Sequence, residues 1–375
     1  MTPEVSRKRL HIVSFDIPFP ANYGGVIDVY YKAKALKALG VEIHLHCFHY
    51  GREESPELKA IAHTVHYYAR RTNRRLVFSR EPYIIASRRS EQLLRKLAAD
   101  DIPILFEGLH TCAYLSAPEI ERKKKLVRTH NIEHDYYRGL ADVERNFSKR
   151  WYFRREARKL QAFEENLACA DHIFAISPAD ARALATRYRN VHHVMAFHPY
   201  EAVEIKPGRG DFALYHGNLE VGENNQAALF LVNEVFNDSP HKLIIAGNNP
   251  SSGLLKAMKG KNNIQLEANI PTNEIDRLIA TAHVNILPTF QATGIKLKLL
   301  AALFRGRYCL VNPPMVANTG VESLCTVAET APAMKARLNE LFEKDIATDE
   351  IERRGKILLE RFSNKVNAEK LLSFI

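Results

Sequence analysis

The sequence predicts an α/β protein built from two doubly wound, Rossmann-like domains, and three observations carry this prediction. The 375 residues exceed one ordinary core and fit two domains of common size. In both halves of the chain, short apolar runs alternate with helical patterns, which is typical of parallel sheets with crossover helices. Residues 198–210, HPYEAVEIKPGRG, have prolines, glycines and charges but no periodicity, so they are expected to link the two halves.

The elements of this prediction follow in chain order. In the first half, strands are expected at residues 10–15, 41–48, 102–106, 125–129, 172–176 and 191–196, and helices at 26–39, 87–99, 147–169 and 178–188. In the second half, strands are expected at 212–216, 242–246, 263–267, 284–287 and 308–311, and helices at 224–236, 252–258, 272–281 and 295–305. The predicted domains are 1–198 and 199–348, and residues 349–375 are expected to form a helix that packs back on the first domain.

The composition is that of a soluble globular protein rather than a membrane-spanning or exported one. Hydrophobic residues make up 46% and charged residues 26% of the chain, and no apolar run approaches the roughly 18 residues that span a bilayer. The N-terminus has no signal-peptide pattern. The five cysteines are widely spaced, without metal-ligand spacing, as expected for thiols in a reducing compartment. A cytoplasmic protein is therefore expected, peripheral to the inner face of the membrane at most.

The positive charge of the chain is concentrated in its first half. Residues 1–198 contain 33 Lys and Arg against 23 Asp and Glu, whereas residues 199–375 contain 20 of each kind. Such asymmetry indicates a surface for an anionic partner, either a lipid membrane or a phosphate-bearing acceptor, although an ordinary solvated surface would fit equally well. No recognition motif supports nucleic-acid binding.

The helix expected from Phe147 is basic and amphipathic, which suggests two interpretations. Its aromatic residues, among them Phe147 and Trp151, fall near one side, and its arginines fall largely elsewhere. Basic amphipathic helices bind anionic membranes. The commoner arrangement has the apolar side in the protein core, and it is slightly favoured here.

The stretch from Thr293 to Val311, TGIKLKLLAALFRGRYCLV, predicts an anion-binding helix start. It combines a glycine turn, a lysine-bearing first turn, a small-residue helix and a buried strand. Because it follows the apolar run at 283–288, Thr293, Gly294, Lys296 and Lys298 are expected at the carboxyl edge of a sheet, where open α/β folds bind ligands. A phosphate-bearing small molecule is the expected ligand.

Two first-domain segments offer polar or glycine-rich groups at strand ends. Gly24 and Gly25 precede a helix and allow close approach of a ligand, but they lack the dinucleotide pattern, and a mere tight turn explains them as well. The run RTHNIEHDYY places His130 and Asn131 beyond a strand. His130 could donate a hydrogen bond or a proton to a reacting group, whereas the alternative is a helix entry with solvated histidines. Asp28 and Asn131 are weaker candidates on the acceptor side.

Three turns in the second half offer neutral donors and one carboxylate. Gly217 and Asn218 follow the first strand in HGNL, and Asn248 follows the next strand in AGNNP. These side chains suit hydrogen bonds to phosphate oxygens or to a base. The later segment NTGVES supplies Thr319, Gly320 and Glu322, whose carboxylate could accept hydrogen bonds from ribose or sugar hydroxyls.

Together, the Gly-Gly turn, HGNL, AGNNP, the GIKLKLLAALFRGR helix and the terminal helix resemble family-4 retaining glycosyltransferases of the GT-B fold. RTHNIEHDYY and RFSNKVNAEKLL also resemble bacterial members that build surface polysaccharides. The resemblance implies two domains facing across a cleft and hexosyl transfer without a metal or other cofactor. It further implies a nucleotide diphospho-sugar donor on the second domain and a saccharide or lipid-linked acceptor on the first.

By position, the resemblance assigns Gly24 and Gly25 to the neighbourhood of the donor diphosphate and His130 to the reacting sugar. Gly217 and Asn218 would border the donor, and Lys296 and Lys298 would offset the diphosphate charge. The usual pair of glutamates appears here as Thr293 and Ala301, and residues 220–226, EVGENNQ, lack the usual basic residue. Two alternatives remain open: a non-hydrolysing nucleotide-sugar epimerase, and a non-catalytic nucleotide-sugar-binding partner.

Overall fold

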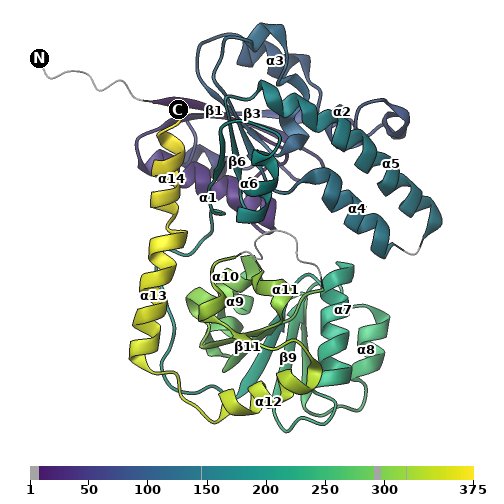
Figure 1. Cartoon of the computed structure of the whole chain (residues 1–375), viewed down its shortest axis with the longest axis vertical. Coiled ribbons are helices and arrows are strands. Elements are labelled where there is room, and N and C mark those ends of the chain that lie inside the picture. Colours follow the sequence, from purple (N-terminus) through teal and green to yellow (C-terminus); the bar gives the residue numbers. More distant parts are fainter. Residues whose placement is uncertain (1–7, 145, 291–296, 318) are drawn as a thin grey trace, which may run out of the picture. The chain divides into compact units, whose positions relative to one another are not determined.

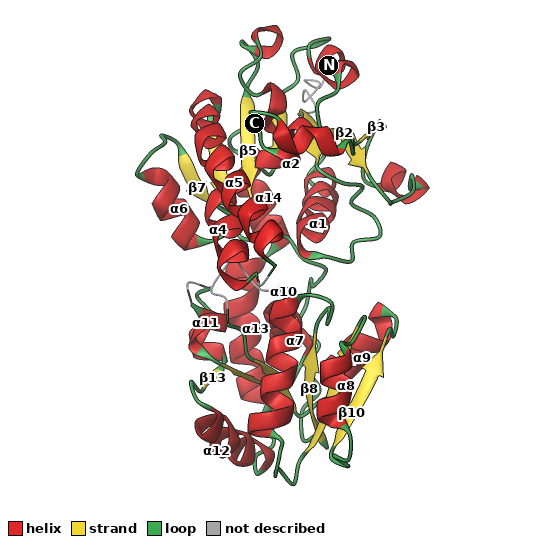
Figure 2. Ribbon diagram, turned by 90° about the vertical axis from the view of Figure 1, so that its right-hand side faces the viewer, coloured by secondary structure: helices red, strands yellow, loops and turns green. Residues whose placement is uncertain are grey.

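The structure, a computed structural model, describes residues 8–144, 146–290, 297–317 and 319–375. The chain forms two compact units. The first comprises Met1–Pro199 together with Phe362–Ile375, and the second comprises Tyr200–Arg361. Each unit has one parallel sheet with helices packed against it (Figures 1 and 2). The predicted α/β class with two doubly wound sheets is therefore confirmed. The predicted domain bounds, 1–198, 199–348 and 349–375, remain predictions.

The sheet of the first unit has the order β3-β2-β1-β4-β5-β6-β7, with all pairs parallel. The strand order reverses between β1 and β4, the place where such sheets bind ligands at their carboxyl ends. The strands are β1 (Arg9–Ser14), β2 (Glu42–His49), β3 (Thr64–Ala69), β4 (Ile104–Glu107), β5 (Lys125–Thr129), β6 (His172–Ala175) and β7 (Val191–His193).

The four helices predicted for this unit are present, two of them with other bounds, but α2 (Tyr83–Ala86) and α4 (Glu133–Val143) were not predicted. The expected helix at 87–99 begins only at Glu91, because Ser90 caps it by accepting a hydrogen bond from the Leu93 amide. The expected helix at 147–169 ends at Phe163 and continues as a 3-10 helix. The α-helices are α1 (Gly24–Ala38), α2 (Tyr83–Ala86), α3 (Glu91–Leu97), α4 (Glu133–Val143), α5 (Phe147–Phe163), α6 (Pro178–Ala185) and α14 (Asn364–Leu372). The 3-10 helices are η1 (Pro56–Ala60), η2 (Arg74–Phe78), η3 (Leu109–Tyr114), η4 (Pro118–Ile120) and η5 (Glu164–Cys169).

The second unit repeats the topology, with the sheet order β10-β9-β8-β11-β12-β13 and parallel pairing throughout. Its strands are β8 (Phe212–His216), β9 (Lys242–Gly247), β10 (Ile264–Ala268), β11 (Val284–Leu287), β12 (Tyr308–Val311) and β13 (Thr326–Val327). Its helices are α7 (Gly222–Phe230), η6 (Leu231–Val235), α8 (Ser252–Met258), α9 (Thr272–Thr281), α10 (Leu297–Arg305), α11 (Pro313–Val316), η7 (Glu322–Leu324), α12 (Ala331–Phe342) and α13 (Thr348–Phe362). The order again reverses at its first strand, between β8 and β11.

The central strands of the first unit are buried on both faces. Ile12 and Val13 of β1 belong to different apolar clusters, as do Leu105 and Phe106 of β4. Neighbouring residues of a strand point to opposite faces, so each face has its own core. This explains why these strands are continuous apolar runs in the sequence rather than alternating ones.

The end of the chain returns to the first unit, as predicted, but through two helices instead of one. Ser363 separates α13 from α14 and caps α14 by accepting a hydrogen bond from the Val366 amide. Helix α14 lies against α1 (Figure 1), and its Leu371 belongs to the same apolar cluster as Val29 of α1. The His198 ring donates a hydrogen bond from Nε2 to the Phe362 carbonyl over 2.7 Å.

The basic amphipathic helix is α5, and the prediction that its apolar side faces the protein core is wrong for the first half of this helix. In α5, Ala157 and Leu160 are buried, but the side of the helix that carries Phe147 and Trp151 is open. Phe147 is 80% exposed and Trp151 is 52% exposed. Among the described residues, no helix combines the length and the apolar character needed to cross a bilayer.

Candidate active site

Five charged or titratable side chains meet at the carboxyl ends of β1, β4 and β5 in the first unit. Asp28 and Lys32 come from α1, Glu107 from the end of β4, Arg128 from β5, and His130 from the residue after the end of that strand. Arg128 forms a two-pronged ion pair with Asp28 over 2.9 and 3.1 Å. Lys32 Nζ lies 2.7 Å from Asp28 Oδ2 and 2.7 Å from Glu107 Oε1. The four ion-paired side chains, all except His130, are at most 1% exposed.

The cations of this network hold Asp28 in the ionised state. Burial alone would raise the pKa of Asp28, but the charges of Arg128 and Lys32 outweigh burial and hold that pKa well below its usual range. Asp28 Oδ1 also accepts a hydrogen bond from the Phe197 amide over 2.8 Å. The Arg128 guanidinium donates to the carbonyls of Val194 and Met195. The network therefore ties α1 and β5 to the segment that leads out of the unit.

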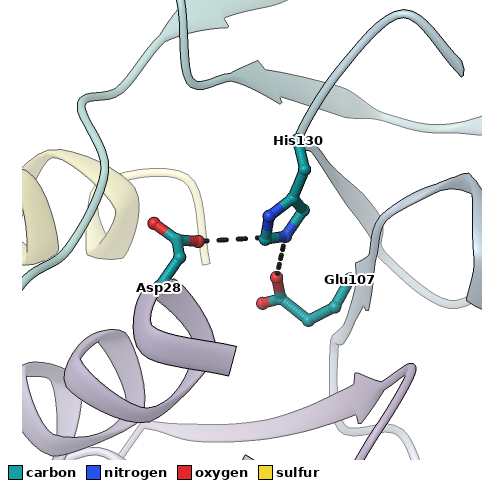
Figure 3. A group of neighbouring side chains, drawn as sticks. All are labelled: Asp28, Glu107 and His130. Carbon is teal, nitrogen blue, oxygen red and sulfur yellow. Dashed lines mark hydrogen bonds and ion pairs between the residues drawn. The ribbon is translucent and has the colours of Figure 1, made fainter. Parts of the chain in front are cut away.

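His130 is the partly accessible member of the group, and its ring is oriented by Glu107. Its Nε2 lies 3.1 Å from Glu107 Oε2 and 3.9 Å from Asp28 Oδ2 (Figure 3). A carboxylate paired with Lys32 only accepts hydrogen bonds, so Nε2 of His130 is the donor. Nδ1 is then the ring nitrogen left to contact a ligand. The predicted residues Asp28 and His130 are thus brought together.

Asp28, Glu107 and His130 are also the one group among the described residues with a spacing that could hold a metal ion. The charges argue against that use. Lys32 and Arg128 already neutralise both carboxylates, and their cationic groups lie within 3.1 Å of the carboxylate oxygens. A divalent cation would have to displace them against strong repulsion. The group therefore fits an internal ion-pair network better than a metal site.

The predicted glycine turn shapes the surroundings of His130. A Cβ atom at Gly25 would lie 2.6 Å from the ring of Phe15. That ring meets the imidazole of His130 edge-on, with 5.4 Å between centroids, and lies equally close to His110. Gly24 begins α1, whose first turn contains no acidic residue. Gly25 is therefore needed for an aromatic side chain to pack beside the histidine.

A small cavity lies next to this centre, at the start of α4. Among the residues that line it are Thr129, Asn131, Glu133 and Glu164. Burial and the charge of Glu164 raise the pKa of Glu133 to about 8. Glu133 is therefore mostly a neutral acid at pH 7. The predicted residue Asn131 hydrogen-bonds to Glu133, which places it in this cavity wall.

The second unit has a comparable, less charged arrangement at the carboxyl ends of β8 and β9. Gly217 follows β8, and its amide donates to the Ala246 carbonyl over 3.0 Å. A Cβ atom at Gly247 would lie 1.9 Å from the Gly217 carbonyl oxygen, so only glycine permits this close approach. Asn218 accepts a hydrogen bond from the Glu220 amide, and the Asn248 carbonyl accepts one from Leu219. Both predicted asparagines thus shape the turn.

Lys298 reaches this turn from the first residues of α10. Its Nζ donates to Asn224 Oδ1 over 2.7 Å and lies 5.3 Å from the ring centroid of Tyr215. His216, the last residue of β8, is buried, and its Nε2 has no hydrogen-bond partner among the described residues. Burial and the charge of Lys298 lower the pKa of His216 to about 3, so its ring is neutral. The structure thus brings together three of the residues that the sequence analysis assigned to the donor: Gly217, Asn218 and Lys298.

A carboxylate and two polar side chains complete this edge of the sheet. Thr289 follows β11 and donates a short hydrogen bond to Glu223 of α7. Asn312, which follows β12, accepts from the Thr289 amide and donates to the Thr289 carbonyl. Ala301, at one of the two positions where the family has a glutamate, is buried in an apolar cluster with Leu278. Its surroundings leave no room for a ligand contact.

The other predicted donor residues lie in a separate turn or outside the described residues. The Thr319 hydroxyl donates to the Val316 carbonyl, and the Gly320 carbonyl accepts from Arg361. Glu322 begins η7 and is exposed. Thr293, Gly294 and Lys296 fall outside the described residues.

Sequence reasoning missed several members of both sites. Lys32 and Glu107 of the first unit were not singled out, nor were Glu223, Asn224 and Thr289 of the second. The spacing of Lys32, four residues after Asp28 on one helix face, was a usable signal. For Thr289 and Glu223, 66 residues apart, no local pattern indicates the pairing.

Comparisons with known proteins agree with this architecture. Anabaena HepE, solved in complex with UDP and glucose, shares 10% identity at a TM-score of 0.67, covering 98% of both chains. A glycosyltransferase from Rickettsia africae shares 13% identity at a TM-score of 0.66, covering 98% of this chain and 97% of its own. S. aureus TarM shares 10% identity at a TM-score of 0.67, covering 98% and 99%. These likenesses establish the GT-B fold.

Comparison of sequences adds evidence on the protein family. Residues 24–196 match the profile of Glycosyltransferase Family 4, a region that contains the whole Asp28 and His130 network. An uncharacterized 44.6 kDa protein in the cps region of Klebsiella pneumoniae is 25% identical over 315 residues, covering 79% of this chain and 80% of that protein. The fold is thus that of the GT-B glycosyltransferases. Over residues 24–196, the sequence is homologous to glycosyltransferase family 4.

Proposed function

We propose that the protein transfers a hexosyl group from a nucleotide diphospho-sugar to a saccharide or lipid-linked acceptor, with retention of configuration and without a metal ion. The observation that carries this proposal is the convergence of Lys298, Asn224 and the Gly217 turn at the carboxyl ends of β8 and β11. A cation at a helix start beside close-packed backbone is suited to a diphosphate. The relative in the cps region of Klebsiella pneumoniae supports a saccharide acceptor.

In this reaction the bond between the sugar C1 and the diphosphate oxygen breaks, and the acceptor hydroxyl oxygen bonds to C1. The acceptor proton passes to the departing diphosphate or to water. Negative charge grows on the leaving diphosphate, so Lys298 stabilises the transition state more than the ground state. Lys296, Thr293 and Gly294 are assigned to the same anion site.

We also propose roles for the remaining residues at the donor and at the acceptor. We assign Gly217, Asn218 and Asn248 to the donor, together with Thr319, Gly320 and Glu322. His216 Nε2, which is buried beside Lys298, can accept a hydrogen bond from the nucleotide-sugar substrate. In the first unit, Gly24 and Gly25 adjoin the diphosphate, and His130 contacts the reacting sugar through Nδ1. Asn131 and Asp28 support the acceptor side, with Asp28 acting through Arg128.

The donor assignment is tested by nucleotide binding to a Lys298→Met variant. Loss of a charged hydrogen-bond donor is expected to weaken nucleoside diphosphate affinity by about 10- to 100-fold. Calorimetric titration with a panel of nucleoside diphosphates and their sugars measures this and identifies the base. Lys256→Met, at an exposed lysine of α8, is the matched control and should bind as the wild type does. Unchanged affinity in Lys298→Met would refute the anion site.

A second candidate function, a non-catalytic nucleotide-sugar-binding partner, is favoured by one observation. Ala301 lies in the apolar core at a position where the family has a glutamate. Product analysis with donor and a broad acceptor panel separates the two candidates. Transfer that His130→Ala lowers about 100-fold, with nucleotide affinity intact, supports the enzyme. Binding without transfer across the panel supports the partner. Conversion of the donor sugar without any acceptor would indicate an epimerase.

A further inference from the structure

We propose that the surface formed by α5 and η2 docks the protein on anionic lipid bilayers. This docking surface comprises three aromatic residues and five basic ones: Phe78, Phe147, Trp151, Lys149, Arg150, Arg154, Arg155 and Arg158. It belongs to the first unit and uses none of the residues assigned to sugar transfer. The inference therefore goes beyond the proposed function and stands independently of it.

The aromatic residues of the docking surface are unusually open to water. Phe147 is 80% exposed, Phe78 is 73% exposed and Trp151 is 52% exposed. Phe147 and Trp151 are four residues apart in α5, so they share one face of the helix. Large aromatic side chains gathered on a surface mark a site of association rather than ordinary exposure.

The three aromatic residues form one continuous surface through Arg155. The guanidinium carbon of Arg155 lies 5.4 Å from the ring centroid of Trp151 and 5.6 Å from that of Phe78. Lys159 donates a hydrogen bond to the Val77 carbonyl over 2.8 Å, which fixes η2 against α5. Helices α4 and α5 lie side by side (Figure 1), so α4 supports α5 from one side and leaves this face open.

The charged side chains that α5 itself presents to water have a single sign. All of α5 is described, and its one acidic residue, Glu156, is buried and paired with Lys159 over 2.6 Å. The charged side chains that α5 presents to water are therefore all basic. Within η2 and on either side of it the chain adds four exposed arginines: Arg71, Arg74, Arg75 and Arg80. A cationic field of this kind complements the phosphates of an anionic leaflet.

A bilayer fits this surface better than a protein partner does. Tryptophan and phenylalanine sit favourably at the depth of lipid headgroups, with arginine side chains extended to the phosphates above them. A bilayer needs no matching shape, whereas a protein partner would need a complementary acidic surface. Each basic residue near the lipid surface contributes roughly a fivefold gain in partitioning. The five basic residues and three aromatics together are sufficient for reversible membrane binding.

The chain carries its own reporter for this proposal, because Trp151 is its only tryptophan. We expect its fluorescence emission to shift to shorter wavelength when the full-length protein meets vesicles of phosphatidylglycerol and phosphatidylcholine in equal parts. Vesicles of phosphatidylcholine alone should give little shift. Raising salt from about 0.1 M to about 0.5 M should reverse much of the shift, because the charges are exposed. Vesicle sedimentation provides the binding curve.

Two pairs of substitutions separate the charge from the aromatic contribution. Arg154→Glu with Arg158→Glu should lower partitioning into anionic vesicles by about 25-fold or more. Phe147→Ser with Phe78→Ser should lower it by at least about tenfold. All four side chains are exposed, so folding should be retained. The matched controls are Lys256→Glu with Lys259→Glu, and Leu255→Ser, at exposed positions of or next to α8. These should bind vesicles as the wild type does.

Three outcomes would overturn the proposal. One is an absence of binding to anionic vesicles by the wild type. Another is binding that the control substitutions lower as much as the docking-surface substitutions do. The last is a change of oligomeric state, seen by analytical ultracentrifugation, in the docking-surface variants without any vesicle binding by the wild type, which would indicate an interface between copies. Nucleotide affinity measured on the same variants tells a misfolded protein from a lost docking surface.

Discussion

The two sheet-edge sites of this protein have the same topology but opposite electrostatic designs. In the first unit, Asp28, Lys32, Glu107 and Arg128 neutralise one another in a buried network, and His130 is left partly accessible at its rim. In the second unit, glycine turns and amides lie beside one described lysine, Lys298, and one carboxylate, Glu223. The first design fixes geometry at the cost of desolvating four charges. The second places a lysine among backbone amides and neutral side chains.

The largest expected effect comes from breaking the charge balance of the first unit. Asp28→Asn leaves Arg128 and Lys32 without their shared carboxylate, and should lower the free energy of unfolding by about 3 to 5 kcal/mol. Urea unfolding measures the loss. Asp142→Asn, at an exposed position of α4, is the control. A loss below about 1 kcal/mol would mean that the network is not a stabilising unit.

The next effect concerns the neutral acid beside that network. The pKa of Glu133 is raised to about 8 in the folded protein, whereas an unburied glutamate has a pKa of 4.5. Between these two pH values the folded state binds more protons than the unfolded state, so wild-type stability falls as pH rises. Glu133→Gln removes this dependence and should stabilise the protein by about 3 kcal/mol at pH 7 and by little at pH 4.

Thermal unfolding from pH 4 to pH 8 checks this prediction, with Glu119→Gln at an exposed carboxylate as the control. Parallel stability profiles for Glu133→Gln and the wild type would show that Glu133 is ionised in the folded protein. In that case the first unit would not hold a neutral acid beside its charge network.

The smallest effect tests whether the second site depends on backbone packing rather than charge. Gly247→Ala would push a methyl group into the Gly217 carbonyl and should cost about 1 to 3 kcal/mol and weaken nucleotide binding. Gly253→Ala in α8 meets no backbone atom, and should be neutral or stabilise the helix by up to about 1 kcal/mol. Denaturant titration and calorimetry on both variants decide the matter. Equal effects would contradict the close approach.

The sequence was sufficient to predict the fold because the parallel strands are apolar runs separated by helical patterns. Strand ends marked by glycine, such as Gly217, also pointed to the edge of the second sheet where Lys298 lies. The pairing of the charged side chains could not be predicted from the sequence. Asp28 and Arg128 are 100 residues apart, and they meet because β1, β4 and β5 are neighbours in the sheet. The exposure of Phe147 could not be predicted either, because the helical pattern of α5 does not show which of its faces α4 covers. The assignments of individual donor residues stay predictions.

The return of the chain through Ser363 has a practical consequence for dissecting the molecule. Because Phe362–Ile375 belong to the first unit, no single cut releases that unit whole. A fragment ending at Pro199 would expose the face of α1 that α14 covers, including Val29, and would lose the Phe362 carbonyl that His198 binds. A fused or added peptide of the last fourteen residues should restore solubility to such a fragment.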